Sequence, residues 1–320
     1  MTPSNKRIVL AGATGYVGRA VAAALLDRGH HVIAVVREPA TKMPGCEIRV
    51  AEVTDAAGMR RALQDSAFDT VISCIASRTG VPDDAWRIDC GANRNLLAAA
   101  LRQGAERFVL LSAICVQKPR LAFQHAKLAF EADLVASGID YTIVRPTAFF
   151  KSLSGQVERV RNGRPFLIFG DGTETARKPI GPADLARFMV DCLDDPFARN
   201  VILPIGGPGD AITPREQGQM LFELAGMPER FRRISPRLFG VAAAALAPVG
   251  AIWPAAAAKA ELARIGHYYA TESMLVWDET RGAYDAGATP STGTETLRDH
   301  YARMLQSDLP GHDLGSHKLF

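Results

Sequence analysis

Apolar runs alternate with segments of helical spacing along the first half of the chain. The apolar runs, typical of buried strands, lie at residues 7–12, 31–37, 47–53, 69–76, 107–113 and 141–146. Helical segments separate them, among them residues 16–29, 83–104 and 121–138. Apolar strands separated by helices indicate a parallel sheet covered on both faces. With right-handed crossovers, this pattern predicts an α/β fold with a Rossmann-type doubly wound parallel sheet.

The second half is less regular and mostly helical. Residues 165–170 and 200–207 have the pattern of strands, and residues 274–284 that of a short hairpin. Pro182 stands at the first position of a predicted helix. Thr213 and Glu216 form a capping box at the start of another.

Residues 239–263 are strongly apolar, but Pro248 and Pro254 interrupt them. Neither uninterrupted piece reaches the roughly 20 residues that a membrane span requires. We expect two buried, alanine-rich helices here, with peripheral contact to a membrane surface as the alternative.

Composition narrows the possible classes of protein. A hydrophobic content of 48% and a charged content of 22% are those of a globular domain. A net charge of +3 is too small to indicate a nucleic-acid partner. The five cysteines form no CxxC pair and the histidines show no metal-ligand spacing, so no metal is expected. With a short polar start at residues 1–10, these features predict a reduced, cytoplasmic protein. The oligomeric state is not readable from the sequence.

A glycine-rich loop, "GATGYVG", joins the first predicted strand to the first helix. In this position Gly12 permits a tight turn, Gly15 lets the backbone approach a pyrophosphate, and Gly18 lets helix and strand pack closely. The free N–H groups of a helix N-terminus favour a phosphate. We therefore expect a dinucleotide bound by this loop, with Thr14, Tyr16 and Val17 as further predicted contacts.

The end of the second strand selects the dinucleotide. Arg37 could bind a 2′-phosphate with its guanidinium, which favours NADPH. Glu38 could instead bind the ribose of NAD if it faced it. Val53, with Glu52, is a predicted adenine contact. The other predicted cofactor contacts follow the carboxyl ends of later strands, where ligands gather in such sheets: Ala76, Ser77, Pro146 and Thr147.

Residues 1–165 are thus expected to form an NADPH-binding Rossmann domain. Residues 166–308 would form a substrate-binding region interleaved with the sheet edge, and residues 309–320 a mobile tail.

The chain resembles a known family. "GATGYVG", Arg37, Ser112 and Lys127 resemble the extended or atypical short-chain dehydrogenase/reductase superfamily. "RPTAFFKSLSGQVERVRNGRPFLIFGDG", "LPIGGPGDAITPREQG" and "GHYYATESMLVWD" are similar to the 8-vinyl reductases of divinyl chlorophyllide. This resemblance implies NADPH-dependent reduction of the 8-vinyl group of divinyl chlorophyllide a or divinyl protochlorophyllide a to ethyl. It also implies chlorophyll or bacteriochlorophyll biosynthesis, here in a phototrophic bacterium, with a tetrapyrrole as the small-molecule partner.

The resemblance implies two catalytic positions, Lys127 and Ser112. Lys127 has two open roles: it orients the nicotinamide ribose, as the superfamily lysine does, or it supplies a proton. Ser112 binds substrate or caps a turn. Phe123 stands one helical turn before Lys127, where many nicotinamide enzymes have a tyrosine proton donor. Reduction of a vinyl group produces no alkoxide, so that donor is less needed.

A tetrapyrrole requires a flat apolar slot and a cation for its carboxylate. The candidates for the slot are Phe123, Phe149, Phe150, Trp253, Tyr268 and Tyr269. The candidates for the carboxylate are Arg145, Lys151 and Lys178. Asp89 has either a role in the site or a structural one, and Asn93 fixes a water or the sheet geometry.

Two rival functions remain open at this point. One is a sugar-nucleotide epimerase or dehydratase on the same fold, which the absence of a tyrosine at Phe123 disfavours. The other is an NADPH-binding redox sensor or accessory subunit without turnover.

Overall fold

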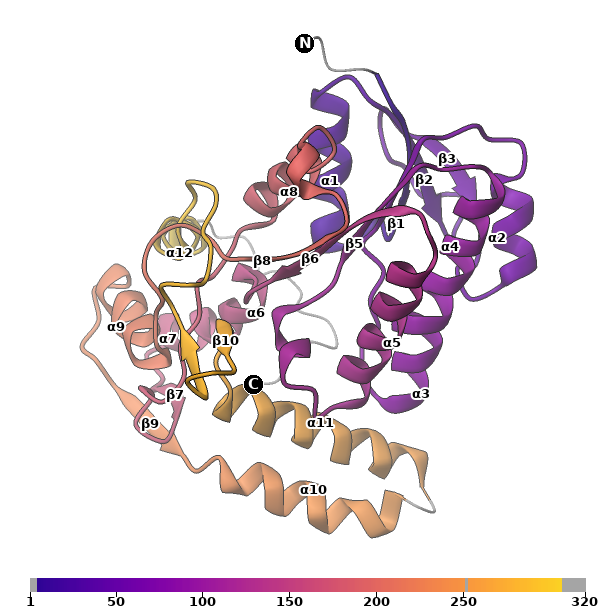
Figure 1. Cartoon of the computed structure of the whole chain (residues 1–320). Coiled ribbons are helices and arrows are strands. Elements are labelled where there is room, and N and C mark those ends of the chain that lie inside the picture. Colours follow the sequence, from indigo (N-terminus) through magenta and orange to yellow (C-terminus); the bar gives the residue numbers. More distant parts are fainter. Residues whose placement is uncertain (1–4, 251–252, 307–320) are drawn as a thin grey trace. The chain divides into compact units, whose positions relative to one another are not determined.

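The computed structural model describes residues 5–250 and 253–306 and divides into two compact units (Figure 1). The first unit comprises the described residues up to Ser77, Asp83–Pro146 and Pro182–Pro204. The second comprises Arg78–Pro82, Thr147–Gly181 and the described residues from Ile205 onward. The chain thus returns to the first unit after the expected boundary at residue 165. The expected tail, residues 309–320, lies outside the described residues.

The first unit is built on a seven-stranded sheet in the order β3-β2-β1-β4-β5-β6-β8. From β3 through β6, neighbouring strands pair in parallel. The strands are β1 (Arg7–Ala11), β2 (His31–Val36), β3 (Glu47–Val50), β4 (Thr70–Ser73), β5 (Arg107–Leu111), β6 (Asp140–Pro146) and β8 (Val201–Ile205). The order reverses between β1 and β4, which confirms the predicted doubly wound fold and puts a ligand-binding edge at the carboxyl ends of these strands.

The helices of this part of the chain lie where the sequence pattern predicts them, but some of their types and boundaries differ from the prediction. They are α1 (Tyr16–Asp27), α2 (Ala56–Leu63), α3 (Pro82–Ala85), η1 (Trp86–Ala92), α4 (Asn93–Arg102), η2 (Ile114–Gln117), α5 (Ala122–Ala136), α8 (Pro182–Asp191) and η4 (Pro196–Ala198). The prediction of a single helix over residues 83–104 was wrong, because the π-helix η1 lies between the α-helices α3 and α4. The strand expected over residues 47–53 ends at Val50.

The second unit is mostly helical, with two small sheets. Its helices are α6 (Phe150–Leu153), η3 (Ser154–Gln156), α7 (Val157–Arg161), α9 (Pro214–Leu224), α10 (Arg237–Gly250), α11 (Pro254–Thr271) and α12 (Leu297–Gln306). Its strands are β7 (Phe166–Phe169) paired with β9 (Phe231–Ile234), and β10 (Val276–Asp278) paired with β11 (Ala283–Asp285). β10 and β11 form the predicted hairpin, and Thr213 and Glu216 make the predicted capping box. A core that includes Phe150, Phe222 and Tyr301 holds this unit together.

The apolar segment at residues 239–263 folds as two helices, as expected, but it is not buried as expected. Pro248 lies inside α10, which continues past it and ends at Gly250. Most residues of α10 are exposed, because α11 covers only one of its faces. Among residues 5–250 and 253–306, no helix is long and apolar enough to cross a membrane.

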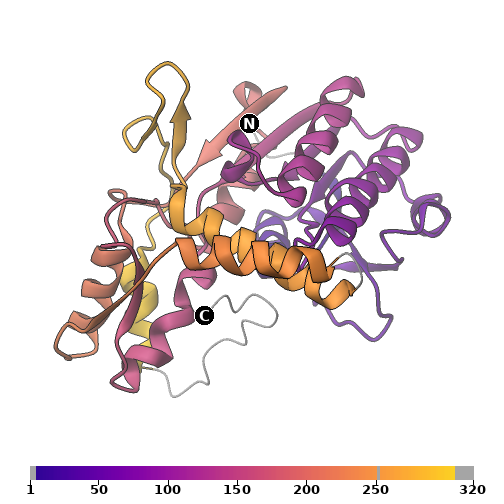
Figure 2. The same cartoon turned by 90° about the horizontal axis from the view of Figure 1, so that it is seen from below.

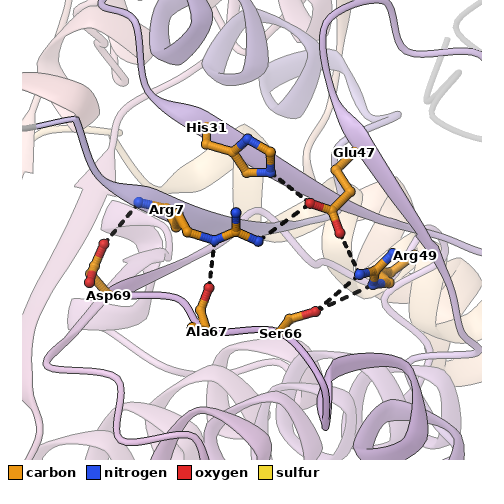
Figure 3. A network of polar contacts seen from close by, with 7 residues as sticks. All are labelled: Arg7, His31, Glu47, Arg49, Ser66, Ala67 and Asp69. Carbon is orange, nitrogen blue, oxygen red and sulfur yellow. Dashed lines mark hydrogen bonds and ion pairs between the residues drawn. The ribbon is translucent and has the colours of Figure 1, made fainter.

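Ion pairs occupy the amino ends of three neighbouring strands in the first unit (Figure 3). Glu47 accepts a hydrogen bond from His31 Nε2 at 2.6 Å, and it pairs with Arg49 and, at 3.5 Å, with Arg7. The hydrogen bond from His31, followed by the nearby arginines, holds the pKa of Glu47 below its usual value. Such partly exposed pairs contribute about 1 kcal/mol or less. This end of the sheet is therefore structural and lies opposite the ligand-binding edge.

Candidate active site

The glycine-rich loop leaves β1 and enters α1 by a turn that only glycine permits at two positions. Gly12 has a φ of 75°, and a Cβ there would lie 2.5 Å from the carbonyl oxygen of Cys74. A Cβ on Gly18 would lie 2.1 Å from the carbonyl oxygen of Gly12. The loop at Gly12, the start of α1 at Gly18 and the segment at Cys74 therefore pack backbone against backbone, with no room for a side chain, as the glycine spacing predicted.

The start of α1 has the features of a phosphate site. Gly15 is the N-cap and offers no side-chain cap, and the first turn carries no acidic residue. Thr14 and Gly15 are exposed. Gly15 thus supplies no side-chain acceptor to the start of α1, and the helix dipole favours an anion there. The loop fits the pyrophosphate of a dinucleotide.

The strand ends around this loop carry the other predicted cofactor contacts. Arg37 follows β2 directly and is exposed, as is Glu38 beside it. Ala76 and Ser77 follow β4, and Ala76 is exposed. Pro146 ends β6. In the second unit, the hydroxyl of Thr147 donates to the carbonyl oxygen of Lys178.

Lys127 forms a buried ion pair with Asp89. The Nζ atom of Lys127 lies 2.8 Å from Oδ1 of Asp89, and their side chains are 12% and 1% exposed. Asp89 also accepts a hydrogen bond from Ser77 Oγ at 2.5 Å. Its carboxylate therefore joins α5 to the segment after β4. An ammonium group has three N–H donors, so Lys127 keeps donors for a ligand.

The π-helix η1 brings Asp89 to this position. Asn93, 1% exposed, donates from Nδ2 to the carbonyl oxygen of Asp89 at 3.0 Å and accepts from Ser73 Oγ at 2.5 Å. Asn93 thus fixes the end of β4 to η1, which is the second of its two predicted roles. π-Helical turns are frequent at functional sites.

Ser112 points its hydroxyl at a buried carboxylate. Its Oγ donates to Glu131, which is 3% exposed. Arg145 binds the same carboxylate through Nη2, and through Nε at 3.3 Å. The hydroxyl proton of Ser112 is therefore engaged, so Ser112 can offer a ligand only an acceptor. Arg145 is engaged as well.

Gln124 anchors the start of α5, which carries Phe123 and Lys127. It is fully buried. Its Oε1 accepts from the backbone N–H groups of Arg120 and Leu121 at 2.7 Å and 2.9 Å, and its Nε2 donates to the carbonyl oxygen of Cys115 at 2.8 Å. Gln124 therefore satisfies N–H groups at the helix entrance that would otherwise be orphaned. This fixes the position of the first turn of α5.

Comparison with known proteins identifies the family. Residues 12–196 match the NAD(P)H-binding family. The chain is 44% identical to the rice (Oryza sativa subsp. indica) divinyl chlorophyllide a 8-vinyl-reductase, over 100% of this chain and 84% of that enzyme. It is 42% identical to the enzyme of the same name from Arabidopsis thaliana, over 98% of this chain and 80% of that enzyme. The chain belongs to the divinyl chlorophyllide a 8-vinyl-reductase family.

Solved structures of other enzymes have the same fold as this family member. The NADPH-dependent quinone oxidoreductase QOR2 of Escherichia coli matches with a TM-score of 0.69 at 21% identity, over 93% of this chain and 100% of that one. A UDP-glucose 4-epimerase of Thermotoga maritima matches with a TM-score of 0.68 at 17% identity, over 94% and 97%. At these identities the likeness concerns the fold alone.

The predicted substrate residues of this 8-vinyl-reductase family member lie in different surroundings. In the first unit, Phe123 is partly buried and packs against the core. In the second unit, Phe150 is 0% and Tyr268 3% exposed, whereas Trp253 is 68% and Tyr269 37% exposed. Phe149 and Lys151 are partly buried. Lys178 donates to Thr289 and Ser291. The slot remains a prediction.

Sequence reasoning missed one cation of the second unit. Arg177 is partly buried, and its Nη2 donates to Thr175 Oγ1 over a long 3.4 Å. Within the described part of the chain it has no carboxylate partner. Burial lowers the pKa of Arg177 to about 10, so it keeps its charge at neutral pH. A desolvated cation without a counter-charge is costly, which makes Arg177 a candidate anion-binding residue. In the sequence, the one feature that pointed to Arg177 was its position next to Lys178, a predicted carboxylate-binding residue.

Proposed function

We propose that this protein uses NADPH to reduce the 8-vinyl group of a divinyl chlorophyll precursor, divinyl chlorophyllide a or divinyl protochlorophyllide a, to ethyl. The observation that carries this proposal is the identity of 42% to 44% with plant 8-vinyl-reductases over 98% to 100% of the chain. The identity extends through both units, so it includes the region expected to bind substrate. The match of residues 12–196 to the NAD(P)H-binding family supports a nicotinamide dinucleotide as the source of the hydride.

The residue at position 123 suits this chemistry. Bound NADPH supplies a hydride, and a vinyl group takes it up together with one proton to give ethyl. If the hydride goes to the terminal carbon, the conjugated macrocycle can delocalise the charge left on the inner carbon. No alkoxide forms, so the reaction does not need a tyrosine where Phe123 stands.

Lys127 is proposed to orient the nicotinamide ribose. Its Nζ is held by Asp89 at 2.8 Å, and its remaining N–H donors suit the hydroxyls of a ribose. Asp89 and Ser77 are then positioning residues, since they act through Lys127. The other open role, proton supply by Lys127, predicts that turnover falls on its replacement while NADPH affinity survives.

Arg37 is proposed to select NADPH by binding its 2′-phosphate. Arg37→Ala removes a charged hydrogen bond worth about 1.5–3 kcal/mol, so the KM for NADPH should rise roughly ten- to a hundred-fold. Steady-state kinetics with NADPH and NADH would measure this, and the KM for NADH should hardly change. Arg60→Ala, at another exposed arginine of the first unit, is the matched control. Equal losses for both cofactors would contradict the assignment.

Arg177 is proposed to bind the carboxylate of the tetrapyrrole. Arg177→Gln should raise the KM for the substrate roughly ten- to a hundred-fold, because a charged hydrogen bond is lost. The KM for NADPH should stay the same. The methyl ester of the substrate gives the sharper measurement: it should bind the native protein and the variant equally weakly. An ester that still distinguishes the two would show that Arg177 acts elsewhere, and Arg281→Gln, at an exposed arginine, is the control.

Oxidation of NADPH on addition of possible substrates separates this function from its rivals. Divinyl chlorophyllide should cause stoichiometric oxidation of NADPH, and UDP-glucose should cause none. Conversion of UDP-glucose to its epimer would instead support an epimerase. NADPH that copurifies, exchanges slowly and is never oxidised by the tetrapyrrole would support a sensor.

A further inference from the structure

Helix α10 has no polar face. After Arg237 its sequence is LFGVAAAALAPVG, without a charged or hydrogen-bonding side chain. A helix that is apolar all round is normally buried on all sides. The two faces of α10, however, lie in different surroundings.

One face of α10 packs inside the second unit. α10 and α11 lie side by side as an antiparallel pair in both views (Figures 1 and 2). A Cβ on Gly266 of α11 would lie 2.9 Å from the ring of Phe239, so the glycine makes room for this ring. Phe239 also meets Phe169 edge-on, with 5.3 Å between ring centroids. Ala243, one turn later, is 6% exposed.

The opposite face of α10 is exposed and equally apolar. Leu238 is 60% and Val241 66% exposed, and Ala242 and Ala245 continue the same face at helical spacing and are also exposed. Trp253, just beyond the end of α10, is 68% exposed. Nothing in the described part of the second unit covers this face. A contiguous exposed apolar surface of this kind marks an interaction site.

The charges that flank α10 along the chain indicate what covers its exposed face. Between Glu229 and Glu261 the chain has no carboxylate, but it has four arginines and one lysine: Arg230, Arg232, Arg233, Arg237 and Lys259. All five are exposed. The arginines lie directly before the apolar helix. Exposed cations beside an apolar helical face, with a tryptophan at its end, are typical of helices that lie on anionic membranes.

We propose that the outer face of α10, with Trp253 and the arginines before it, binds the surface of a bilayer that contains anionic lipids. The apolar side chains enter the headgroup boundary, and the arginines neutralise lipid phosphates. The helix lies on the membrane and does not cross it, in keeping with its length. This gives Trp253 a role outside the predicted substrate slot. This contact with a membrane does not depend on the reductase activity.

Cosedimentation with vesicles tests this proposal on the full chain. The protein should bind vesicles of phosphatidylcholine mixed with phosphatidylglycerol, and bind phosphatidylcholine vesicles at least ten-fold less. The double variant Leu238→Asp/Val241→Asp should lose at least ten-fold of the binding to the mixed vesicles. The matched control is Phe197→Asp/Ile202→Asp, which changes two exposed apolar residues of the first unit and should bind like the native protein. The variants alter only exposed side chains, so their circular dichroism and NADPH affinity should be unchanged.

Two further measurements separate the possible occupants of this face. Arg232→Glu/Arg237→Glu should abolish the preference for anionic vesicles, and the emission of the native protein should shift to the blue on binding, a shift that Trp253→Phe removes. Equal binding of the aspartate variant and the native protein would overturn the proposal. Failure to bind either kind of vesicle would also overturn it. In that case, sedimentation velocity could show a dimer of the native protein that the variant Leu238→Asp/Val241→Asp does not form. This result would assign the face to a second copy of the chain.

Discussion

Replacing Lys127 with alanine is expected to lower the turnover of the divinyl substrate by about a hundred-fold or more. Misplacement of a reacting group by about 1 Å costs on that order, and Lys127 is the group proposed to hold the nicotinamide ribose. NADPH affinity should fall as well, because the ribose loses its hydrogen bonds. Single-turnover kinetics and NADPH titration on the same preparation would measure both effects.

The ion pair with Asp89 complicates this variant and also provides its control. Lys127→Ala leaves a carboxylate that is 1% exposed without its counter-charge, which costs about 3–5 kcal/mol of folding stability. The double variant Lys127→Met/Asp89→Asn removes both charges, so its thermal stability should recover while turnover stays low. Glu47→Gln, in the ion pairs at the opposite end of the sheet, should keep both turnover and NADPH affinity. Near-native turnover in the double variant would show that Lys127 has only a structural role.

Gly18→Ala is expected to weaken NADPH binding by about a hundred-fold or more. The new Cβ would lie 2.1 Å from the carbonyl oxygen of Gly12 and 2.9 Å from its carbonyl carbon. These are backbone atoms, so the phosphate loop itself has to move. Overpacking of this kind also costs about 1–3 kcal/mol of folding stability. Fluorescence titration with NADPH and thermal unfolding would measure the two effects.

Gly240→Ala is the matched control for this change. Gly240 also lies in a helix, and a Cβ there would meet nothing within 4 Å. Alanine is the better helix former by about 0.5–1 kcal/mol, so this variant should be slightly more stable and should bind NADPH normally. If Gly18→Ala bound NADPH as tightly as Gly240→Ala does, the loop would not be the phosphate site.

The features that could be predicted from the sequence are those with local signals. Apolar runs predicted the strands, because both faces of a parallel sheet are buried. The spacing of Gly12, Gly15 and Gly18 predicted a loop whose contacts leave no room for a Cβ at two of the three positions. The capping box at Thr213 was readable for the same reason, since its partners are three residues apart.

The features that could not be predicted depend on partners far apart in the chain. The sequence alone left open whether Asp89 belongs to the site or is structural, because nothing local shows that the π-helix η1 turns it toward Lys127. Ser112 was expected to bind substrate or cap a turn, and nothing local shows that its hydroxyl donates to Glu131 on α5. The exposure of α10 was missed because an alanine-rich apolar segment has the same pattern whether it packs on two sides or on one.

The reaction itself is the most direct test of the account. Incubation with NADPH and divinyl chlorophyllide a should give a product two mass units heavier, with its Soret band shifted to the blue, because the reduced vinyl group leaves the conjugated system. With NADPH deuterated at the transferred position, the product should be three mass units heavier and carry the label on the terminal carbon of the new ethyl group. Label on the inner carbon would contradict the proposed direction of hydride addition. An unchanged spectrum and mass, with NADPH still bound, would contradict the reductase function altogether.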